Sequence, residues 1–568
     1  MANDFIRKVD CMYGNNEGRN SAGYSCVKFL FVTACVLMSM LFLCSRSYAA
    51  LQLPKSLSDH ILFQQEEPIV VWGKASPGST ITAEISYEDS GATVNKGSAV
   101  ADADGKWAIS LRPLKASFKK YSIKISGDGT PLLIHDVLVG ELWFSSGQSN
   151  MELRLRYIVG GQDLMASATR DSIRIFYQDT VDEAWRNGVP QSPVDDTVNG
   201  RWVPANSGAN VANCSGIAYT FALALYEALN KNGKEVPVGV MNSALGSTGV
   251  ESWMSRAAAE SDPLIKAKLP VDWNVGHWGP YHQPWDQATA LFNVKVAPLT
   301  RHAVRGFLWG QGENNAAWGE VGAEFYKKAL TALIADWRHQ WGGQPRAFIL
   351  TQLGAYDDGG KIPLNNLESW AYMREAQFEV AQTVPQTAAI PVHDLPLTWN
   401  VGDFGYKSPI HPLDKKPVGE RMALAARGIA YKEPIEYKGP IFDRMEIHGG
   451  KAVLHFQHAQ GLKVEGDGRL SGFAICGTDR RFVEAEARIV NNSVEVSNPQ
   501  VKSPVAVTYA FTDMNHCANL SNDANLAAYP FRTDKVQSAF LKGCTAAEAE
   551  AAIERQSQSE NAKGMGSK

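Results

Sequence analysis

The chain has 568 residues, and its 55 Lys and Arg against 59 Asp and Glu leave a formal charge of −4. At roughly 100–200 residues per domain, this length predicts about three or four domains. A composition of 45% hydrophobic and 20% charged residues excludes a disordered, collagenous or coiled-coil protein. Because no excess of positive charge is available to neutralise phosphates, nucleic acid is not expected as a partner.

The first 50 residues have the pattern of a secretory signal peptide. Basic residues precede an apolar stretch over 29–44, and small residues over 47–49 suit cleavage by signal peptidase. The sequence therefore predicts a secreted or periplasmic protein. The segment is long for a signal, so initiation at Met12 and an uncleaved membrane anchor are the alternatives, and a membrane is a partner only in the second case.

Four of the eight cysteines lie in this leader, and the other four are Cys214, Cys476, Cys517 and Cys544. Four cysteines in so long a chain do not form a disulfide framework, although an oxidising compartment permits one or two bridges among three pairings. They lack paired C-x-x-C spacing, so no structural zinc site is expected.

A β domain is predicted over 51–136. Apolar residues occupy every second position over 81–85, and the pair Asp104-Gly105 precedes the alternating run 107–111. This spacing, together with an Asp-Gly turn, predicts antiparallel strands and a hairpin at that turn. We expect a small β-sandwich in this part of the chain.

Strand-like and helical segments alternate over 137–433, which we assign to one α/β domain. The strand candidates are Val137–Ser145, Val236–Asn242, Val304–Trp309, Ala347–Leu353 and Ala388–His393. The helix candidates are Ile217–Leu229, Phe325–Trp341, Trp370–Thr383 and Pro417–Tyr431. Such alternation predicts a mainly parallel sheet covered on both faces, with the active-site loops at the carboxyl ends of its strands.

A second β domain is predicted over 434–545. Gly449-Gly450 and Asn491-Asn492 each separate two strand-like runs, which is the pattern of β-hairpins, and Val505–Phe511 supplies a further strand. The tail over 546–568 is rich in Glu, Gln, Ser and Ala, so we expect a frayed helix or a flexible segment there.

The most informative motif is Gly147-Gln148-Ser149-Asn150-Met151, which ends the first strand candidate of the α/β domain. Ser149 lies where a helix would begin, and the free backbone N–H groups of a helix start favour developing negative charge. The motif differs from the G-x-S-x-G turn of α/β-hydrolases, because Met151 stands at the second glycine position. Ser149 is therefore either a nucleophile or a helix N-cap.

Two further strand ends carry candidate hydrogen-bond donors. Gly246 lies in a turn rich in Gly and Ser after one strand candidate, and Gln311 and Asn315 follow another. The Gly246 backbone N–H and a side-chain N–H of Gln311 or Asn315 suit an oxyanion hole, whereas turn capping is the alternative for both loops. Trp278 lies in an aromatic-rich loop that either stacks on a sugar ring or packs against the core.

A serine hydroxyl is a poor nucleophile until a base removes its proton. Among the 12 histidines, His411 is best placed, because it lies in a proline-flanked loop just before the last helix candidate of the domain. If His411 is this base, activity should fall as the imidazole becomes protonated below roughly pH 6–7.

These motifs resemble those of the sialate O-acetylesterase family of SGNH-type (GDSL-like) serine esterases. The resemblance rests on Gly147–Met151, Trp309–Asn315, Ile410–Pro412 and Lys415–Arg421, with flanking matches at 58–60, 370–377 and 530–534. The resemblance covers nearly the whole mature chain. It implies a three-layer α/β esterase domain flanked by β-sandwich-like domains, and the removal of acetyl groups from sugar hydroxyls without a metal or an organic cofactor.

Carried over by position, the resemblance makes Ser149 the nucleophile and His411 the base. It places the oxyanion donors at Ser149, Gly246 and Gln311, and we expect Asn315 and Trp278 to contact the substrate.

The chain departs from the family pattern at the acid of the triad. Many related enzymes have an aspartate three residues before the histidine, and Ser408 stands at that position here. An acid must orient the imidazole if the site follows triad logic. Asp403 is favoured because it is closer to His411 in sequence, Asp394 is the alternative, and a Ser–His dyad is the third interpretation.

The expected partner is an acetylated carbohydrate, and the sequence does not predict an oligomeric state. Within the esterases, the alternative substrate is acetylated xylan or another polysaccharide. From a different class of protein, the alternative is a carbohydrate-binding protein whose esterase centre has decayed.

Overall fold

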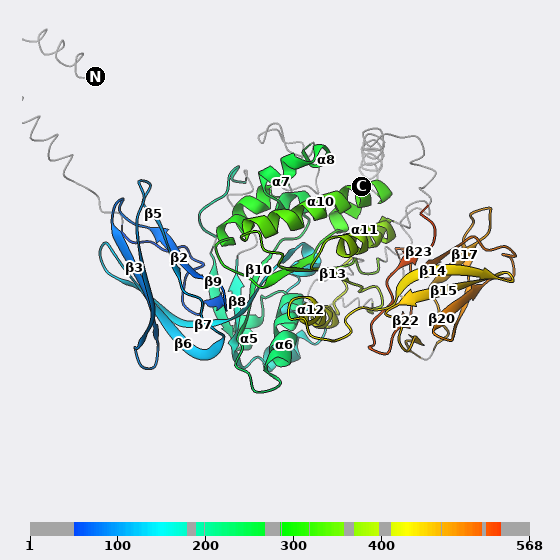
Figure 1. Ribbon diagram of the computed structural model, residues 1–568, viewed down its shortest axis with the longest axis horizontal. Helices are drawn as coiled ribbons and strands as arrows, with labels where there is room; N and C mark the ends of the chain where they lie inside the picture. Colours follow the sequence, from blue (N-terminus) through cyan, green and yellow to red (C-terminus); the bar gives the residue numbers. More distant parts are fainter. Residues whose placement is uncertain are drawn as a thin grey trace, which may run out of the picture.

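The computed structural model describes residues 50–178, 189–197, 199–266, 285, 287–316, 319–356, 369–396, 410–466, 468–513 and 518–535. A β unit, a layered α/β unit and a second β unit follow one another along the chain (Figure 1). The predicted α/β class with flanking β units is therefore confirmed. Residues 1–49 of the predicted signal segment over 1–50, and the tail over 546–568, lie outside the described residues. No helix within the described ranges is both long and apolar enough to cross a membrane.

A sheet forms the middle of the α/β unit, with its main strands in the order β13-β12-β11-β7-β10-β8-β9. These are β7 (Leu132–Gly147), β8 (Arg170–Tyr177), β9 (Arg201–Ala205), β10 (Val238–Ala244), β11 (Gly306–Gly310), β12 (Ala347–Thr351) and β13 (Thr387–Ile390). Neighbours pair in parallel except β9, which runs antiparallel to β8 at one edge. The mainly parallel sheet is confirmed, and β8 with β9 is the part that the sequence analysis missed.

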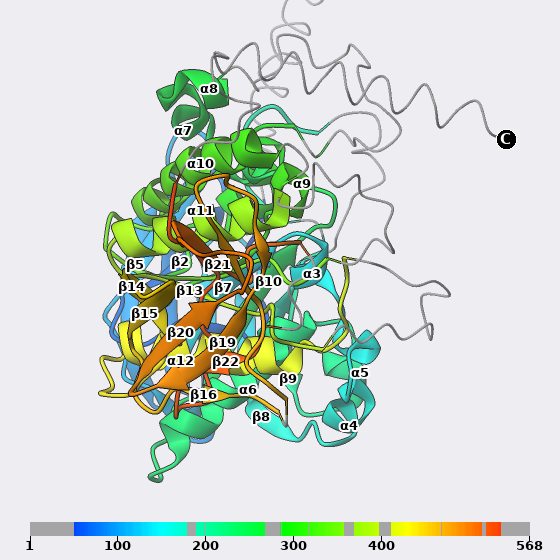
Figure 2. The ribbon, with the colours of Figure 1, turned by 90° about the vertical axis from the view of Figure 1, so that its right-hand side faces the viewer.

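Helices cover both faces of this sheet, which makes the unit three layers thick. The helices α10 (Gly319–Gln340) and α11 (Ser369–Thr383) lie together on one face, and α6 (Gly216–Asn230) and α12 (Lys416–Ile429) on the other (Figures 1 and 2). Neighbouring residues of one strand point into opposite layers. The strands are therefore apolar almost throughout, because both of their faces are buried.

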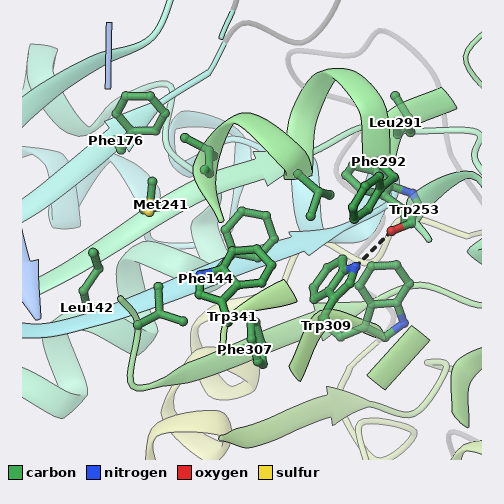
Figure 3. Packing of buried hydrophobic residues seen from close by; sticks show 14 of the residues in the cluster. Leu142, Phe144, Phe176, Met241, Trp253, Leu291, Phe292, Phe307, Trp309 and Trp341 are labelled. Carbon is green, nitrogen blue, oxygen red and sulfur yellow. Dashed lines mark hydrogen bonds between the residues drawn. The ribbon is translucent and has the colours of Figure 1, made fainter. Parts of the chain in front are cut away.

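The layer beneath α10 is built largely from aromatic rings (Figure 3). Phe144 of β7 and Trp309 of β11 both pack edge-on against Trp337, with ring centroids 5.2 and 5.4 Å apart. Trp309 is also linked to the loop after β11. Its indole N–H donates to the Tyr326 hydroxyl, and this hydroxyl donates to the Gln311 carbonyl at 2.7 Å. The aromatic core thus fixes the loop that follows β11.

The first β unit contains two sheets. The strands β3 (Thr80–Tyr87), β4 (Thr93–Val100) and β6 (Ser117–Ser126) lie in one, with β6 pairing onto β7, and β2 (Ile69–Lys74) pairs with β5 (Lys106–Leu111) in the other. The strand β1 (Leu62–Gln64) pairs in parallel with β7. The hairpin predicted at Asp104-Gly105 is wrong, because the turn leads from β4 in one sheet to β5 in the other.

Strand β7 belongs to both the first β unit and the α/β unit. Its first half pairs with β6 and β1, and its second half pairs with β10 and β11. The domain boundary predicted between 136 and 137 therefore falls inside one continuous strand.

The second β unit contains two four-stranded sheets, which pack over an apolar core, and a pair of short strands. One contains β14 (Ile441–His448), β15 (Lys451–Gln457), β20 (Ser493–Ser497) and β19 (Glu486–Val490), and the other β18 (Val483–Glu484), β17 (Phe473–Cys476), β21 (Ala506–Tyr509) and β23 (Phe531–Arg532). The short strands β16 (Lys463–Val464) and β22 (Leu520–Ser521) pair with each other. Both predicted hairpins form, and Gly449, Gly450, Asn491 and Asn492 all have positive φ, as tight hairpin turns require.

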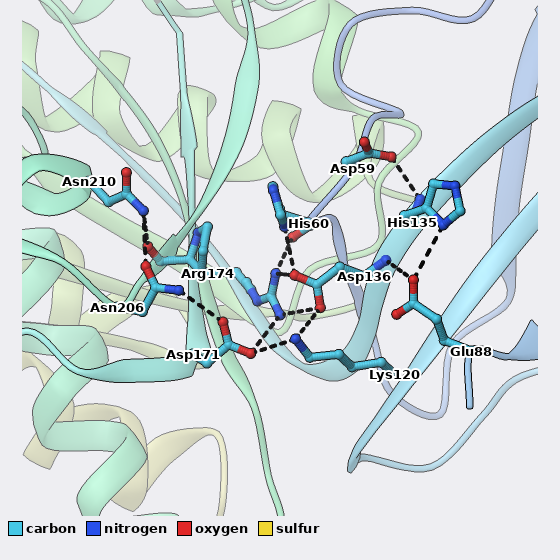
Figure 4. Close-up of polar contacts among 11 residues, drawn as sticks. Asp59, His60, Glu88, Lys120, His135, Asp136, Asp171, Arg174, Asn206 and Asn210 are labelled. Carbon is cyan, nitrogen blue, oxygen red and sulfur yellow. Dashed lines mark hydrogen bonds and ion pairs between the residues drawn. The ribbon is translucent and has the colours of Figure 1, made fainter.

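An ion-pair cluster joins the first β unit to the central sheet (Figure 4). The fully buried Arg174 donates to both carboxylate oxygens of Asp136, at 2.7 and 2.9 Å, and Lys120 and His60 contact the same carboxylate at 2.8 and 2.6 Å. Burial raises the pKa of Asp136, but the hydrogen bonds from Arg174 and Lys120 outweigh it and hold this pKa well below its ordinary value. The cluster thus ties β7 at Asp136 to β8 at Arg174 and to β6 at Lys120.

Replacing Arg174 with Met should lower the free energy of unfolding by about 3 kcal/mol, because Asp136 would keep a charge that has lost its buried partner. Urea denaturation measures this difference. The matched control is Arg256→Met, which breaks an exposed pair with Glu260 (2.8 Å) and should cost at most about 0.5 kcal/mol. Equal losses in the two variants would contradict a structural role for the cluster.

Candidate active site

A glycine turn at the end of β7 places Ser149 at the start of the short helix α3 (Ser149–Glu152). Gly147 has a φ of +141°, and a Cβ atom there would lie 2.1 Å from the carbonyl oxygen of Gly310. Only glycine therefore fits between β7 and β11 at this point. The N–H of Gln148 donates to the same Gly310 carbonyl at 2.9 Å, which fixes the backbone immediately before Ser149.

The structure brings Ser149 and His411 together. The serine Oγ lies 2.8 Å from the imidazole Nε2, within hydrogen-bond distance, although 262 positions separate the two residues in the chain. His411 lies in the loop that leads into α12, and Ser149 follows β7. A hydroxyl that is hydrogen-bonded to a neutral imidazole is the arrangement in which a base activates a serine.

Asn150 ties the loop of Ser149 to the loop of His411. Its amide donates to the Ile410 carbonyl at 2.8 Å and to the Glu313 carboxylate at 2.5 Å, and its amide oxygen accepts from the Lys415 ammonium at 2.6 Å. None of these side chains was assigned a role from the sequence. The available signal was the position of Asn150 directly after Ser149 and of Lys415 four residues after His411.

Burial and charge determine the state of the imidazole. Burial, with a smaller contribution from the Lys415 ammonium, lowers the pKa of His411 to about 4. Burial also lowers the pKa of Lys415 to about 8 and raises the pKa of Glu313. His411 is therefore neutral, and able to accept a proton, well below the pH of 6–7 at which the sequence predicted the loss of activity.

Gly246 lies beside Ser149, and its N–H has a partner. A Cβ atom on Gly246 would lie 3.2 Å from the Ser149 Cβ. The Gly246 N–H donates to the carboxylate of Glu152, the last residue of α3, at 2.7 Å. The next residue, Ser247, has a φ of +59°, so the loop turns sharply at this point.

The side-chain amide of Gln311 donates hydrogen bonds to other groups of the protein. Its Nε2 donates to the Asn315 side chain at 2.7 Å, to the Thr248 carbonyl at 3.0 Å and to the Gln148 side chain at 3.2 Å. The residue is 1% exposed. An amide has only two N–H groups, and in this structure both have acceptors within the protein, so Gln311 as an oxyanion donor stays a prediction that this geometry does not favour.

Asn315 is likewise buried and hydrogen-bonded within the protein. Its amide donates to Glu251 at 3.1 Å, and its oxygen accepts from the Val250 N–H at 3.1 Å. The contact between Asn315 and the substrate stays a prediction, which these internal hydrogen bonds do not favour. Together with Gln311, this side chain connects the loops that follow β10 and β11.

Asp394, one of the two candidate acids, pairs with α12. Both of its carboxylate oxygens accept from Arg421, at 2.6 and 2.7 Å, and no hydrogen bond joins Asp394 to His411. Burial raises the pKa of this carboxyl, but the hydrogen bonds from Arg421 outweigh it and lower the pKa. Asp394 is thus a structural ion-pair partner. Asp403 and Trp278 lie outside the described residues.

Within the described part of the chain, no three His, Cys, Asp or Glu side chains form a group that could hold a metal ion. Cys214 and Cys476 are buried and not in a disulfide, and Cys517 and Cys544 lie outside the described residues.

Comparison with known proteins identifies related chains over most of the length. Residues 139–411 match the family described as "Carbohydrate esterase, sialic acid-specific acetylesterase". The sialate O-acetylesterases of Mus musculus and Homo sapiens are 25% and 24% identical to this chain, over 84% of its length and 93% and 90% of theirs. A solved structure of a carbohydrate acetylesterase from Xanthomonas citri is 32% identical, with a TM-score of 0.72, over 86% of this chain and 100% of that one.

Because the pKa of His411 is low, the enzyme should remain active at pH values well below neutrality. The specificity constant kcat/KM should stay level down to about pH 5 and fall around pH 4, as the free imidazole takes up a proton. A pH profile with p-nitrophenyl acetate measures this limb. A fall centred near pH 6.5, the ordinary value for histidine, would contradict the effect of burial.

The Lys415→Met variant should move the same acid limb to higher pH, because the buried ammonium beside His411 disfavours the imidazolium. Lys416→Met is the matched control, since the Lys416 side chain is 52% exposed and pairs with Glu420 on α12. An acid limb that stays in place in Lys415→Met would show that Lys415 does not tune the base.

Proposed function

The chain belongs to the carbohydrate esterase family of sialic acid-specific acetylesterases and is a carboxylic-ester hydrolase; we propose that it removes acetyl groups from sugar hydroxyls through an acetyl-enzyme on Ser149. The observation that carries this proposal is the 2.8 Å hydrogen bond between Ser149 and His411 at the carboxyl ends of the central strands. That edge of the sheet is where α/β enzymes bind their ligands.

In the first half of the reaction, His411 Nε2 takes the hydroxyl proton while Ser149 Oγ attacks the acetyl carbonyl. The tetrahedral intermediate then collapses, the bond to the sugar oxygen breaks, and His411 returns its proton to the leaving alkoxide. Water attacks the acetyl-enzyme in the second half, again with His411 as the base. Acetate leaves, and the Ser149 hydroxyl is restored.

The proposed oxyanion donors are the backbone N–H groups of Ser149 and Gly246. Ser149 is the first residue of α3, where an N–H has no acceptor within the helix, and Gly246 lies against it. Backbone donors held in place by the fold stabilise the negative charge that develops on the acetyl oxygen. Gln311 is not among the proposed donors, because its side chain is buried and its N–H groups join the loops that follow β10 and β11.

Asp403 remains the proposed acid, because Asp394 is bound by Arg421. A Ser–His dyad is the alternative, and Asp403→Asn separates the two. If Asp403 orients His411, this variant should lose a large part of kcat, by analogy with the acid of other serine triads. An unchanged kcat favours the dyad.

The proposed substrate is an acetylated carbohydrate, in line with the names of the relatives, which are sialate and carbohydrate acetylesterases. Sialic acid esters and acetylated polysaccharides such as xylan are both candidates. Release of acetate from a panel of acetylated glycans identifies the sugar. We also propose that the leader directs export, which N-terminal sequencing of the protein from a secreting host tests.

The direct test of the mechanism is the Ser149→Ala variant with p-nitrophenyl acetate. Loss of the nucleophile should lower kcat by at least about a thousandfold. Ser167→Ala, which removes an exposed hydroxyl after α4 (Gly161–Ala166), is the matched control and should be as active as the parent. Comparable rates in Ser149→Ala and the parent would remove Ser149 from the mechanism. Glycan binding without acetate release would favour the carbohydrate-binding alternative.

A further inference from the structure

One proposed oxyanion donor is already occupied. The Gly246 N–H donates to Glu152 Oε2 at 2.7 Å, a distance typical of a charge-assisted hydrogen bond. Gly246 is also close to Ser149, since a Cβ atom added to Gly246 would lie 3.2 Å from the Ser149 Cβ. The Glu152 carboxylate therefore binds an N–H group beside the proposed nucleophile. A backbone N–H provides a single donor hydrogen, and an acetyl oxygen must compete with Glu152 for it.

The Glu152 carboxylate is partly buried where it binds the Gly246 N–H. Burial raises the pKa of this carboxyl, against lowering contributions from the Gly246 N–H, Lys295 and Arg154. Arg154 follows α3 in the chain, and Lys295 is buried in the helical turn Phe292–Val296. A partly desolvated carboxylate is thus held against the donor without a direct ion pair to either cation.

We propose that Glu152 is a displaceable occupant of the oxyanion hole, a carboxylate that stands where the acetyl oxygen of the substrate, and later the acetate product, must bind. The inference rests on the proposed function, because it takes Gly246 as an oxyanion donor. No covalent step is involved: substrate binding exchanges one acceptor on the Gly246 N–H for another.

This occupancy has a consequence for product inhibition. Acetate is a carboxylate, like the Glu152 side chain, and two carboxylates on one donor repel each other as well as compete. The native enzyme should therefore bind free acetate weakly. If the donor is open in only about a tenth of the molecules, the apparent affinity for acetate is reduced about tenfold.

The Glu152→Gln variant tests this idea. The neutral amide is a weaker acceptor and does not repel an anion, so the inhibition constant for acetate should fall about tenfold and kcat/KM for p-nitrophenyl acetate should rise. Glu152→Asp keeps the charge but is one methylene shorter, so it releases the Gly246 N–H and should also strengthen acetate inhibition. Asp163→Asn, which neutralises an exposed carboxylate on α4, is the matched control and should leave both constants unchanged.

If Glu152 is only a structural clamp on the loop, its variants should lose stability or activity, but acetate should inhibit them no more strongly than the parent. An unchanged inhibition constant in both Glu152 variants therefore overturns the proposal. Acetate binding can also be measured without turnover, because a ligand that binds the folded protein raises its Tm. A larger rise in Glu152→Gln than in the parent supports the proposal even if Ser149→Ala proves active, so this inference and the proposed mechanism fail separately.

Discussion

The Ser149–His411 hydrogen bond depends on the central position of β7 in the sheet. Strands β10 and β11 flank β7 on its two sides, so the loops after all three strands converge at one edge. The absence of a side chain at Gly147 lets β7 and β11 end in close contact, and the chain then turns into α3. Asn150 completes the arrangement by binding the loop of His411. A displacement of any of these loops would separate the hydroxyl from the imidazole.

The fold was predictable wherever the signal in the sequence was local. Alternating strands and helices gave the three-layer unit, and Gly449-Gly450 and Asn491-Asn492 gave two hairpins whose turns need positive φ. Ser149 and His411 were predictable for a related reason: each follows a recognisable element, and the carboxyl ends of parallel strands must meet. The resemblance to a known family then gave their roles, which the spacing alone does not provide.

Other features depend on contacts that no local pattern contains. An amide such as Gln311 donates equally well to a ligand or to a neighbouring loop, and only the three-dimensional packing shows that it serves the loop. The same holds for the Glu152 carboxylate on Gly246 and for the turn at Asp104-Gly105, which joins two sheets. The low pKa of His411 arises chiefly from burial, which depends on the whole surrounding structure.

The central claim is that Ser149 carries the acetyl group during turnover. Rapid acid quenching of the enzyme with an acetylated substrate, followed by peptide mass spectrometry, tests this claim most directly. One acetyl group is expected on the peptide that contains Ser149, and it should be lost after a longer incubation as water completes the cycle. Acetate release with no acetylated peptide, or with the acetyl group on a different residue, would contradict it.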